Sequence, residues 1–430
     1  MLRECIILAD APNALVELCG ISILERLLRT LQRCGITNAT VLSSTPQLIE
    51  EHLRRHSWAR DKIRWKLHER ASESMTVKDI VNLWPGDERF LLVVRGDTVL
   101  DIRLLQILCA QSSAATLIDS SVPKELEPLV AQAPSVRGGK LCGAALISLD
   151  WTLAQTGPFE SALRNSVEER AISTVDVADQ PVYYPALRRK LRPFWFRLTD
   201  SAHRKLAGPV LFDSVQKGTL DFPALIHAPI ESFLLSRLCR TSITPHQLSI
   251  SWIVAAFGAT AFFATGHLVW GIVLAFVVGI IDGLDGKQAR IKVETTKGGS
   301  LEHRFDDFFD VAWPTALAWH FYSSGELPGA FRYLLVLLLA EALDGIGKAG
   351  IYFASRKSLS EPGVFDRIVR FIGGRRNIYV WVLTAGIILG APAKAFIVMV
   401  WWELITALVD LPHAAWALYR GRERSRSDAR

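Results

Sequence analysis

Apolar and polar residues follow different patterns in the two parts of the chain. Up to about Ile243, short apolar runs alternate with charged segments, as they do in a water-soluble domain. No run in this part reaches the roughly 20 apolar residues that cross the hydrocarbon core of a bilayer. After Ile243, long apolar runs follow one another. We therefore expect a soluble N-terminal part and a C-terminal part embedded in a membrane.

The N-terminal part alternates between strand-like and helix-like patterns. The opening ECIILADAPNALVELCGISILERLLRTLQRCGITNATVLSS predicts a strand, a loop, a helix and a second strand, and RFLLVVRGDTVLD predicts a buried strand that leads to Asp97. Such apolar strands are typical of a parallel sheet covered on both faces. We expect an α/β domain over residues 1–184, followed by a connector with interfacial helices over residues 185–243. The connector segment RPFWFRL combines aromatic and basic residues, which suit the head-group layer of a membrane.

Six apolar segments after the connector are expected to be membrane spans. They are roughly Leu248 to Thr265, Leu268 to Gly286, Asp307 to Tyr322, Phe331 to Phe353, Ile378 to Gly390, and Ala395 to Tyr419. A soluble helical bundle would need polar faces on these runs, and VWGIVLAFVVGII has none. The predicted fold of residues 244–419 is therefore an all-α polytopic membrane domain with six transmembrane helices, followed by a basic tail over residues 420–430.

The loops between these segments predict the orientation. RKSLSEPGVFDRIVRFIGGRR, the basic loop between the second and third segments, and the Arg-rich tail all fall on one side, whereas TGHL, SSGELPG and GAPA contain no lysine or arginine. Because basic loops remain in the cytoplasm, both termini are expected there. The bases of a chain with a net charge of +6 concentrate beside the apolar runs and in the tail, which indicates anionic lipid rather than nucleic acid as the partner.

The cysteines share no CxxC spacing, and none lies in the apolar part. They are Cys5, Cys19, Cys34, Cys109, Cys142 and Cys239. We interpret them as buried reduced thiols of a cytosolic domain rather than as disulfides or a zinc site. The start MLRECIILADAPNAL has no basic segment followed by an apolar core and a small-residue cleavage site, so no signal peptide is expected.

Acidic residues interrupt the apolar part at two places. Asp282 and Asp285 are three residues apart, so a helix places both on one face. In the next segment an acidic stripe repeats every four residues and consists of Glu302, Asp306 and Asp310. At membrane depth such carboxylates repel one another unless cations lie between them, and hard oxygen ligands suit Mg²⁺ or Mn²⁺, which can polarise a diphosphate. The alternative for a single acid, such as Asp307, is a solvated helix end.

The acids belong to a longer pattern. The spacing Asp282-x-x-Asp285-Gly286-x-x-Ala289-Arg290, followed by a glycine and two further acids four apart, resembles the signature of the CDP-alcohol phosphatidyltransferase family. The resemblance extends over roughly Lys217 to Tyr419 and includes the segment TSITPHQLS, in which His246 stands in place of an asparagine.

One departure from the family pattern leaves two alternatives for the later acids. The usual eight residues between the arginine and the glycine lead to His303 and Asp307, whereas a spacing of seven leads to Glu302 and Asp306. We choose the second alternative because a neutral histidine is a poor substitute for a bridging carboxylate beside a hard cation.

The resemblance implies a role for each matching residue. The implied metal ligands, for Mg²⁺ or Mn²⁺, are Asp282, Asp285, Glu302 and Asp306. Asp306 would also take the proton from the attacking hydroxyl. The implied nucleotide contacts are Thr244, Pro245, Gly283, Gly286, Ala289 and Arg290. Arg375 and Arg376, in GGRRN, would bind the acceptor's phosphate, and the alternative for this pair is a role in topology and lipid charge.

The order of elements in the N-terminal part resembles nucleotidyltransferases that act on sugar and inositol phosphates. Their phosphate-binding loop is rich in glycine and carries arginine and lysine, but LADAPNALVEL contains none of these residues. We therefore interpret residues 1–184 as a nucleotidyltransferase-like domain that has lost catalysis, in which Asp97 is a relic or a loop cap. The whole chain resembles the fused inositol-phosphate cytidylyltransferase and phosphotransferase enzymes.

Together these features predict an integral membrane transferase of phospholipid synthesis. It would transfer a phospho-alcohol or phosphatidyl group from a CDP-activated donor to an alcohol acceptor, with release of CMP, and the resemblance also implies a homodimer. Two alternatives remain open. A bifunctional enzyme would also make the CDP-alcohol in its N-terminal domain, and a membrane transporter would use the buried acids as a relay.

Overall fold

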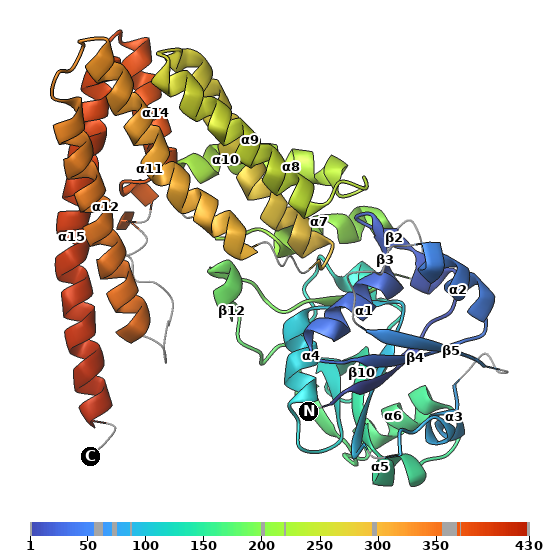
Figure 1. The fold of residues 1–430 in the computed structure, drawn as a ribbon. Coiled ribbons are helices and arrows are strands. Elements are labelled where there is room, and N and C mark those ends of the chain that lie inside the picture. Colours follow the sequence, from blue (N-terminus) through green and yellow to red (C-terminus); the bar gives the residue numbers. More distant parts are fainter. Residues whose placement is uncertain are drawn as a thin grey trace. The chain divides into compact units, whose positions relative to one another are not determined.

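The computed structural model describes residues 2–55, 63–70, 75–86, 88–198, 203–218, 221–294, 299–354, 368–369 and 371–427. The side chains of residues 55, 299–303, 348, 350–354, 414, 417–418 and 420–427 lie outside this description. The chain divides into two compact units, whose elements are drawn in Figure 1. The first unit comprises Met1–Tyr184, Arg189–Gln216 and Arg290–Glu294, and the second comprises Pro185–Arg188, Lys217–Ala289 and Thr295–Arg430.

A central sheet organises the first unit. Its strand order is β11-β8-β10-β6-β1-β4-β5, with β9 paired to β10. The pairs β1/β4, β1/β6, β4/β5 and β8/β11 are parallel, and β10 runs antiparallel to β6 and β8. The strands are β1 Glu4–Leu8, β4 Asn38–Ser43, β5 Arg64–Glu69, β6 Phe90–Arg95, β8 Ala115–Asp119, β9 Ser135–Val136, β10 Gly139–Ser148 and β11 Ser173–Asp176. The α/β architecture and the predicted buried strand before Asp97 are confirmed.

Helices cover both faces of this sheet, because successive strand residues point to opposite sides. In β1, Cys5 and Ile7 pack into one core cluster with α1, α2 and α4, whereas Ile6 packs into a second cluster with α3, α5 and α6. The helices are α1 Ile23–Arg33, α2 Pro46–Arg55, α3 Val77–Asn82, α4 Ile102–Cys109, α5 Leu149–Leu153 and α6 Phe159–Glu168. Burial on both sides explains why β1 reads as a continuous apolar run.

Short polar side chains begin several of these helices. The Glu25 N–H donates to Ser22 Oγ at 3.1 Å at the start of α1, and Thr76 forms a capping box with Asp79 at the start of α3. Asp101 accepts from the Arg103 N–H at the start of α4. Each cap satisfies a backbone N–H that the first helical turn leaves without a partner.

The remaining elements of the first unit are short. They are β2 Glu17–Leu18, β3 Ile21–Ser22, β7 Thr98–Leu100, β12 Tyr183–Tyr184, β13 Arg189–Lys190, β14 Trp195–Arg197, the 3-10 helices η1 Asn13–Leu15 and η3 Glu127–Val130, and helix α7 Arg204–Ser214. The antiparallel pair β7/β14 matches Arg197 with Thr98 and so brings a late arginine to the loop after β6. Within the described residues the six cysteines form no disulfide, and Cys5, Cys142 and Cys239 are buried whereas Cys19, Cys34 and Cys109 are only partly buried.

The second unit is built of helices. They are α8 Phe222–Leu238, α9 Pro245–Ala264, α10 Leu268–Ile291, α11 Gly299–Ser323, α12 Ala330–Ala354, α14 Arg376–Ile388 and α15 Pro392–Ser427, with the 3-10 helix η4 Pro185–Leu187. Six of these helices, α9 to α12, α14 and α15, coincide with the six predicted segments.

Three helices in the described part of the chain are long and apolar enough to cross a membrane. They are Pro245–Ala264, Leu268–Ile291 and the Pro392–His413 part of α15. Helix α14 is apolar but has only 13 residues, and α11 carries the acidic stripe in its first half. The structure therefore supports three of the six predicted spans by length and composition, and it supports the helical character of all six.

Helix α8 has its polar side chains inside and its apolar side chains outside. His227 and Glu231 are buried one turn apart, whereas Leu225, Ile230 and Phe233 are exposed. An amphipathic helix of a soluble protein shows the opposite arrangement. An apolar outer face of this kind suits a helix that lies against lipid.

The same arrangement continues over the candidate spans. Val254 of α9, Trp270 of α10 and Leu408 of α15 are 65%, 61% and 60% exposed, while Trp252 and Phe396 are fully buried inside the bundle. Soluble proteins rarely present contiguous apolar surface on several helices. The membrane interpretation is therefore preferred over a soluble helical bundle.

Candidate active site

The two acids of α10 lie on one face of the helix, as their spacing requires. Asp285 is buried, and the Ser249 hydroxyl of α9 lies 2.9 Å from its Oδ2. The same hydroxyl lies 3.1 Å from the carbonyl oxygen of Pro245. Ser249 therefore connects the Asp285 carboxylate to the first turn of α9, where two of the predicted nucleotide contacts lie.

Asp282, one turn before Asp285, faces the acidic stripe of α11. The charges of Asp306 and Asp285 both lie close enough to repel that of Asp282, and Arg376 and Lys217 partly offset this repulsion. The structure therefore places Asp282 of α10 within electrostatic range of Asp306 of α11, and the metal-binding role of these acids stays a prediction.

The position of Asp306 bears on the choice between the two acidic alternatives. Asp306 is partly buried and interacts with Asp282, whereas its neighbour Asp307 is exposed. Glu302 and His303 lie on the first turns of α11, and both side chains fall outside the described residues. The choice between these two stays a prediction, in which Glu302 shares the helix face of Asp306 one turn earlier.

Arg376, the first residue of α14, pairs with the acidic stripe. Its guanidinium lies 2.8 Å from Asp306 and 3.4 Å from Asp310, and it also donates to the Asp306 carbonyl oxygen at 3.3 Å. Arg375 is the N-cap residue of α14, with extended backbone, and interacts electrostatically with Asp310. The predicted acceptor-binding pair thus lies beside the acids, with Arg376 bound to the proposed base.

The entry to α9 forms as the TSITP segment suggests. Thr244 is the N-cap, and its side chain and that of Gln247 form a capping box, with Pro245 in the first turn. Gln288 of α10, which the sequence reasoning missed, is fully buried and donates to the carbonyl oxygen of Ile243 at 3.1 Å. Its position three residues after Asp285, on the same helical face, was the available signal.

Gly283 makes room for a protein side chain in this structure. A Cβ atom at this position would collide with the carboxylate of Glu231 from α8. Glu231 lies 2.6 Å from Lys287 Nζ, and both residues are buried, so removing either would leave an uncompensated charge. Gly286 and Ala289 are partly exposed on α10. The nucleotide contacts predicted for these small residues stay predictions.

Arg290 belongs to the first unit, with the residues up to Glu294. Its Nε donates a hydrogen bond to the carbonyl oxygen of Val215 at 2.9 Å. The nucleotide contact predicted for Arg290 stays a prediction.

Helix α15 holds the segment that carries the arginine pair, which the sequence reasoning did not foresee. The Gly374 N–H donates to Thr406 Oγ1 at 2.9 Å, and Trp402 Nε1 donates to the carbonyl oxygen of Ile372 at 2.7 Å. The Tyr379 hydroxyl donates to Glu403 Oε2 at 2.6 Å. Because these bonds lie on both sides of Arg376 in the sequence, α15 fixes where α14 begins.

Within the described residues, no group of three histidine, cysteine, aspartate or glutamate side chains is close enough to hold a metal ion. The donor type nevertheless fits a hard divalent cation, because Asp282, Asp285 and Asp306 present carboxylates whose charges repel. The fourth predicted ligand, Glu302, has its side chain outside the description. The residues present therefore match the metal in chemistry.

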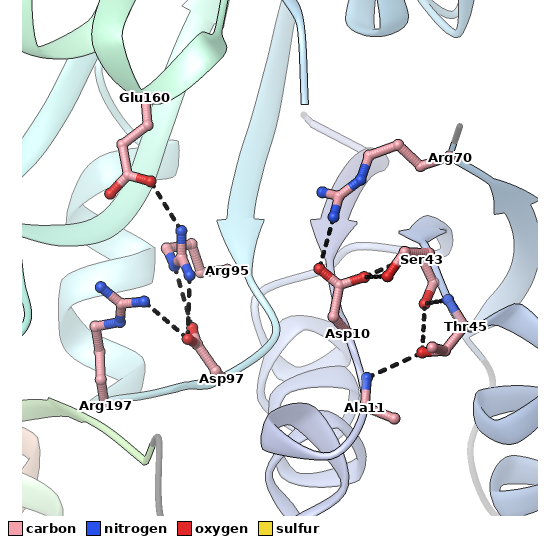
Figure 2. Close-up of polar contacts among 10 residues, drawn as sticks. Asp10, Ala11, Ser43, Thr45, Arg70, Arg95, Asp97, Glu160 and Arg197 are labelled. Atoms are coloured by element: carbon pink, nitrogen blue, oxygen red, sulfur yellow. Dashed lines mark hydrogen bonds and ion pairs between the residues drawn. The ribbon is translucent and has the colours of Figure 1, made fainter. Parts of the chain in front are cut away.

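In the first unit, Asp97 follows β6 and is held by cations (Figure 2). Arg95 lies 3.1 Å and Arg197 2.9 Å from its Oδ2. Burial raises the pKa of Asp97, but the two guanidiniums outweigh burial and hold this pKa below its ordinary value. Asp97 is thus an ionised member of a salt-bridge network, which agrees with a loop-holding role rather than metal binding.

Comparison with known protein families identifies the helical part. A family model described as CDP-alcohol phosphatidyltransferase matches residues 242–409. This segment is a CDP-alcohol phosphatidyltransferase domain. The match includes the acids of α10 and α11 and the arginine pair at the start of α14, so the resemblance inferred from the spacing of the acids is confirmed.

Curated relatives include two proteins named bifunctional IPC transferase and DIPP synthase. The one from Rubrobacter xylanophilus is 31% identical over 163 residues, which make up 37% of this chain and 34% of the relative. The one from Aquifex aeolicus is 27% identical over 159 residues, 36% of this chain and 35% of the relative. A phosphatidylinositol phosphate synthase of Corynebacterium glutamicum is 31% identical over 115 residues, 26% of this chain and 52% of the relative. The chain thus spans about a third of the first two relatives and about half of the third.

Similar solved structures include two nucleotidyltransferases. The inositol-1-phosphate CTP transferase from T. maritima has 10% identity and a TM-score of 0.34, covering 48% of this chain and 94% of that one. A UDP-glucose pyrophosphorylase from Acinetobacter baumanii has 10% identity and a TM-score of 0.35, covering 53% of this chain and all of that one. No activity is transferred to this chain from a similarity of this degree.

Proposed function

We propose that this chain is an integral membrane CDP-alcohol phosphotransferase of phospholipid synthesis. It transfers a phospho-alcohol or phosphatidyl group from a CDP-activated donor to the hydroxyl of an alcohol acceptor and releases CMP. The observation that carries this proposal is the approach of Asp282, Asp285 and Asp306 from two helices of the matched domain. Carboxylates among apolar helices are costly, so their convergence indicates a functional site.

The carboxylates hold Mg²⁺ or Mn²⁺ in this proposal, with Glu302 as the fourth ligand beside Asp282, Asp285 and Asp306. When bound, a divalent ion supplies the positive charge that neutralises the donor's diphosphate and polarises its phosphorus. Ser249, through its hydroxyl 2.9 Å from Asp285 Oδ2, orients one of these ligands.

Asp306 takes the proton of the attacking hydroxyl, and the oxygen of that hydroxyl forms the new bond to phosphorus as the CMP oxygen leaves. The Arg376 guanidinium, 2.8 Å from Asp306, holds this carboxylate in place. Arg375 and Arg376 supply positive charge for a phosphate on the acceptor. The nucleotide is held by Thr244, Pro245, Gly283, Gly286, Ala289 and Arg290.

In this proposal helices α11, α12 and α14 complete a six-span domain over residues 244–419, with both termini and the basic tail, residues 420–430, in the cytoplasm. The outward apolar face of α8 supports an interfacial connector over residues 185–243. The active form is a homodimer.

Residues 1–184 form an inactive nucleotidyltransferase-like domain in this proposal. Its loop LADAPNALVEL offers no glycine or cation to a phosphate, and the Asp97 carboxylate is occupied by two arginines. The names of two curated relatives favour the bifunctional alternative. Incubation of the full chain with CTP and sugar or polyol phosphates separates the two, because diphosphate release would establish the bifunctional enzyme.

The test of the proposal is CMP release by the purified protein from a panel of CDP-activated donors and alcohol acceptors. Asp282→Asn and Asp285→Asn should abolish CMP release. Chelation of divalent cations should also abolish CMP release by the wild type, and addition of Mg²⁺ or Mn²⁺ should restore it. Glu326→Gln, an exposed acid in a turn of the same unit, is the matched control and should leave release unchanged. Ion flux in liposomes without CMP formation would instead establish a transporter.

A further inference from the structure

The first unit contains a cavity of about 220 Å³ at the carboxyl ends of β1 and β6. Its polar lining consists of Asp10, Asn13, Arg70, Arg95, Asp97, Glu160 and Arg197. Apolar side chains, among them Met75, Val93 and Phe159, form the rest of the lining. In open α/β sheets, the carboxyl ends of the strands are where ligands bind.

The charges around this cavity are paired, as Figure 2 shows. Arg70 lies 2.7 Å from Asp10 on one side. On the other side, Asp97 pairs with Arg95 and Arg197, and Arg95 lies 3.0 Å from Glu160. Among the described residues, three guanidiniums and three carboxylates therefore line the cavity, and the formal charges of these six groups cancel.

Two of the arginines also present donors that the protein does not use. Arg70 and Arg197 are 9% and 8% exposed, and the Nε of each is buried without a hydrogen-bond partner among the described residues. Buried donors without partners are rare in native proteins because they lose their hydration without replacement. A ligand in the cavity would meet other N–H groups of these two guanidiniums, because the Nε atoms themselves have almost no accessible surface.

We propose that this cavity binds a small uncharged polyhydroxylated molecule, a polyol or a sugar. A hydroxyl group donates and accepts, so neighbouring hydroxyls can donate to the carboxylates of Asp97 or Glu160 while they accept from guanidinium N–H groups. The ring of Phe159 offers an apolar surface to the C–H face of such a molecule.

Charge and size exclude a nucleoside triphosphate as the occupant. A triphosphate would bring several negative charges against three carboxylates in a lining without excess positive charge. The cavity is also smaller than the roughly 300–1,000 Å³ of pockets that hold drug-sized ligands. This proposal concerns the first unit alone and does not depend on the membrane activity.

Isothermal titration of the full chain in detergent, with glucose, mannitol and inositol, tests the proposal. Their phosphate esters and CTP with Mg²⁺ are titrated in parallel. We expect at least one uncharged compound to bind, with its phosphate ester and CTP weaker by about tenfold or more. The proposal is wrong if no uncharged compound binds, or if a phosphate ester or CTP binds more tightly than every uncharged compound.

Variants locate the binding. Glu160→Gln, whose side chain is 46% exposed and is therefore not needed to fill the core, should weaken binding about tenfold, and Arg197→Gln should do the same. Arg164→Gln is the matched control, because Arg164 is exposed on α6, the helix that carries Glu160. Circular dichroism checks that Arg197→Gln is folded. If folded Glu160→Gln binds the ligand as tightly as the wild type does, the ligand lies elsewhere and the proposal is wrong. This conclusion holds whether or not Arg197→Gln is folded.

Discussion

The two units arrange their acids in opposite ways. Around the cavity of the first unit, Asp10, Asp97 and Glu160 each lie within ion-pair distance of a guanidinium. In the second unit, Asp282 faces other carboxylates, and the guanidinium of Arg376 is shared among several acids. In the first unit each of these carboxylates already has a cationic partner. Carboxylates that outnumber their cationic partners in an apolar setting need a cation from outside the chain. The position of arginines, more than that of aspartates, therefore distinguishes the proposed polyol cavity from the proposed metal site.

The two units also differ in which side chains they bury and which they expose. The first unit buries its apolar residues in two clusters on either face of a sheet, and few of its described large apolar side chains are exposed. The second exposes large apolar side chains such as Val254 and buries polar ones such as Glu231 and Gln288. Polar groups inside such a bundle have no water to replace their partners, so each acid there is costly and is expected to have a function.

The largest expected effect is that of removing the proposed base. Asp306→Asn should lower the rate of CMP release about 10²–10⁴-fold, because the attacking hydroxyl then has no proton acceptor. Asp307→Asn, a change at the exposed neighbouring residue, is the matched control and should stay within a few-fold of the wild type. The opposite result, with Asp307 essential, would establish the alternative that pairs it with His303.

Asp97→Asn is expected to cost the first unit about 3 kcal/mol of unfolding free energy, since it leaves the buried guanidinium of Arg197 without its carboxylate. Thermal unfolding in detergent measures the loss, with Asp150→Asn at an exposed site as the control. The rate of CMP release per folded molecule should not change. A large loss of CMP release without loss of stability would contradict the assignment of Asp97 to a structural network.

The same carboxylate predicts a pH dependence. Because the pKa of Asp97 is lowered in the folded state, its contribution to stability is complete above the ordinary aspartate value of about 3.9 and is lost as the pH falls through the folded pKa. In Asp97→Asn this contribution should be absent at every pH. The free energies of unfolding of the wild type and of Asp97→Asn should therefore converge as the pH falls from neutral to acid. A difference between them that stays constant with pH would contradict this prediction.

A smaller effect is expected from the contact between α15 and the start of α14. Thr406→Val removes the acceptor of the Gly374 N–H, so Arg375 and Arg376, the proposed acceptor-binding arginines, should lose part of their alignment. We expect KM for the acceptor to rise about fivefold with little change in kcat. Thr260→Val, in α9, is the matched control because that hydroxyl bonds only within its own helix among the described residues. An equal effect of both changes would show a general loss of packing.

The smallest effect concerns the thiols of the first unit. Burial raises the pKa of Cys34 to about 12 and that of Cys109 to about 11, so very little thiolate exists at pH 8. Alkylation of the native protein should be slow at pH 8 and about tenfold faster at pH 9, as the thiolate fraction rises. Mass spectrometry of the labelled residues measures both rates. Fast labelling of Cys34 at pH 8 would show that this part of the unit opens.

Local patterns in the sequence predicted much of the architecture. The continuous apolar run in ECIIL and the amphipathic run that follows predicted β1 and α1, and the three-residue spacing of Asp282 and Asp285 predicted that they share a helix face. These features depend on neighbours within one or two turns, which the sequence displays directly. The six apolar segments were likewise visible, although only three of the helices have the length and composition of a span in the described part.

Only the tertiary structure decided which charges meet. Arg376 pairs with Asp306 across 70 residues, and Arg197 reaches Asp97 across 100, and no periodicity marks either partner. Gly283 lies against Glu231 because α8 and α10 pack together, which neither segment reveals alone. The sequence by itself determined which residues are apolar, acidic or helical and therefore the two kinds of unit. The physical reason that the rest escaped it is that ion pairing and burial depend on distances in space, which the packing of remote segments sets.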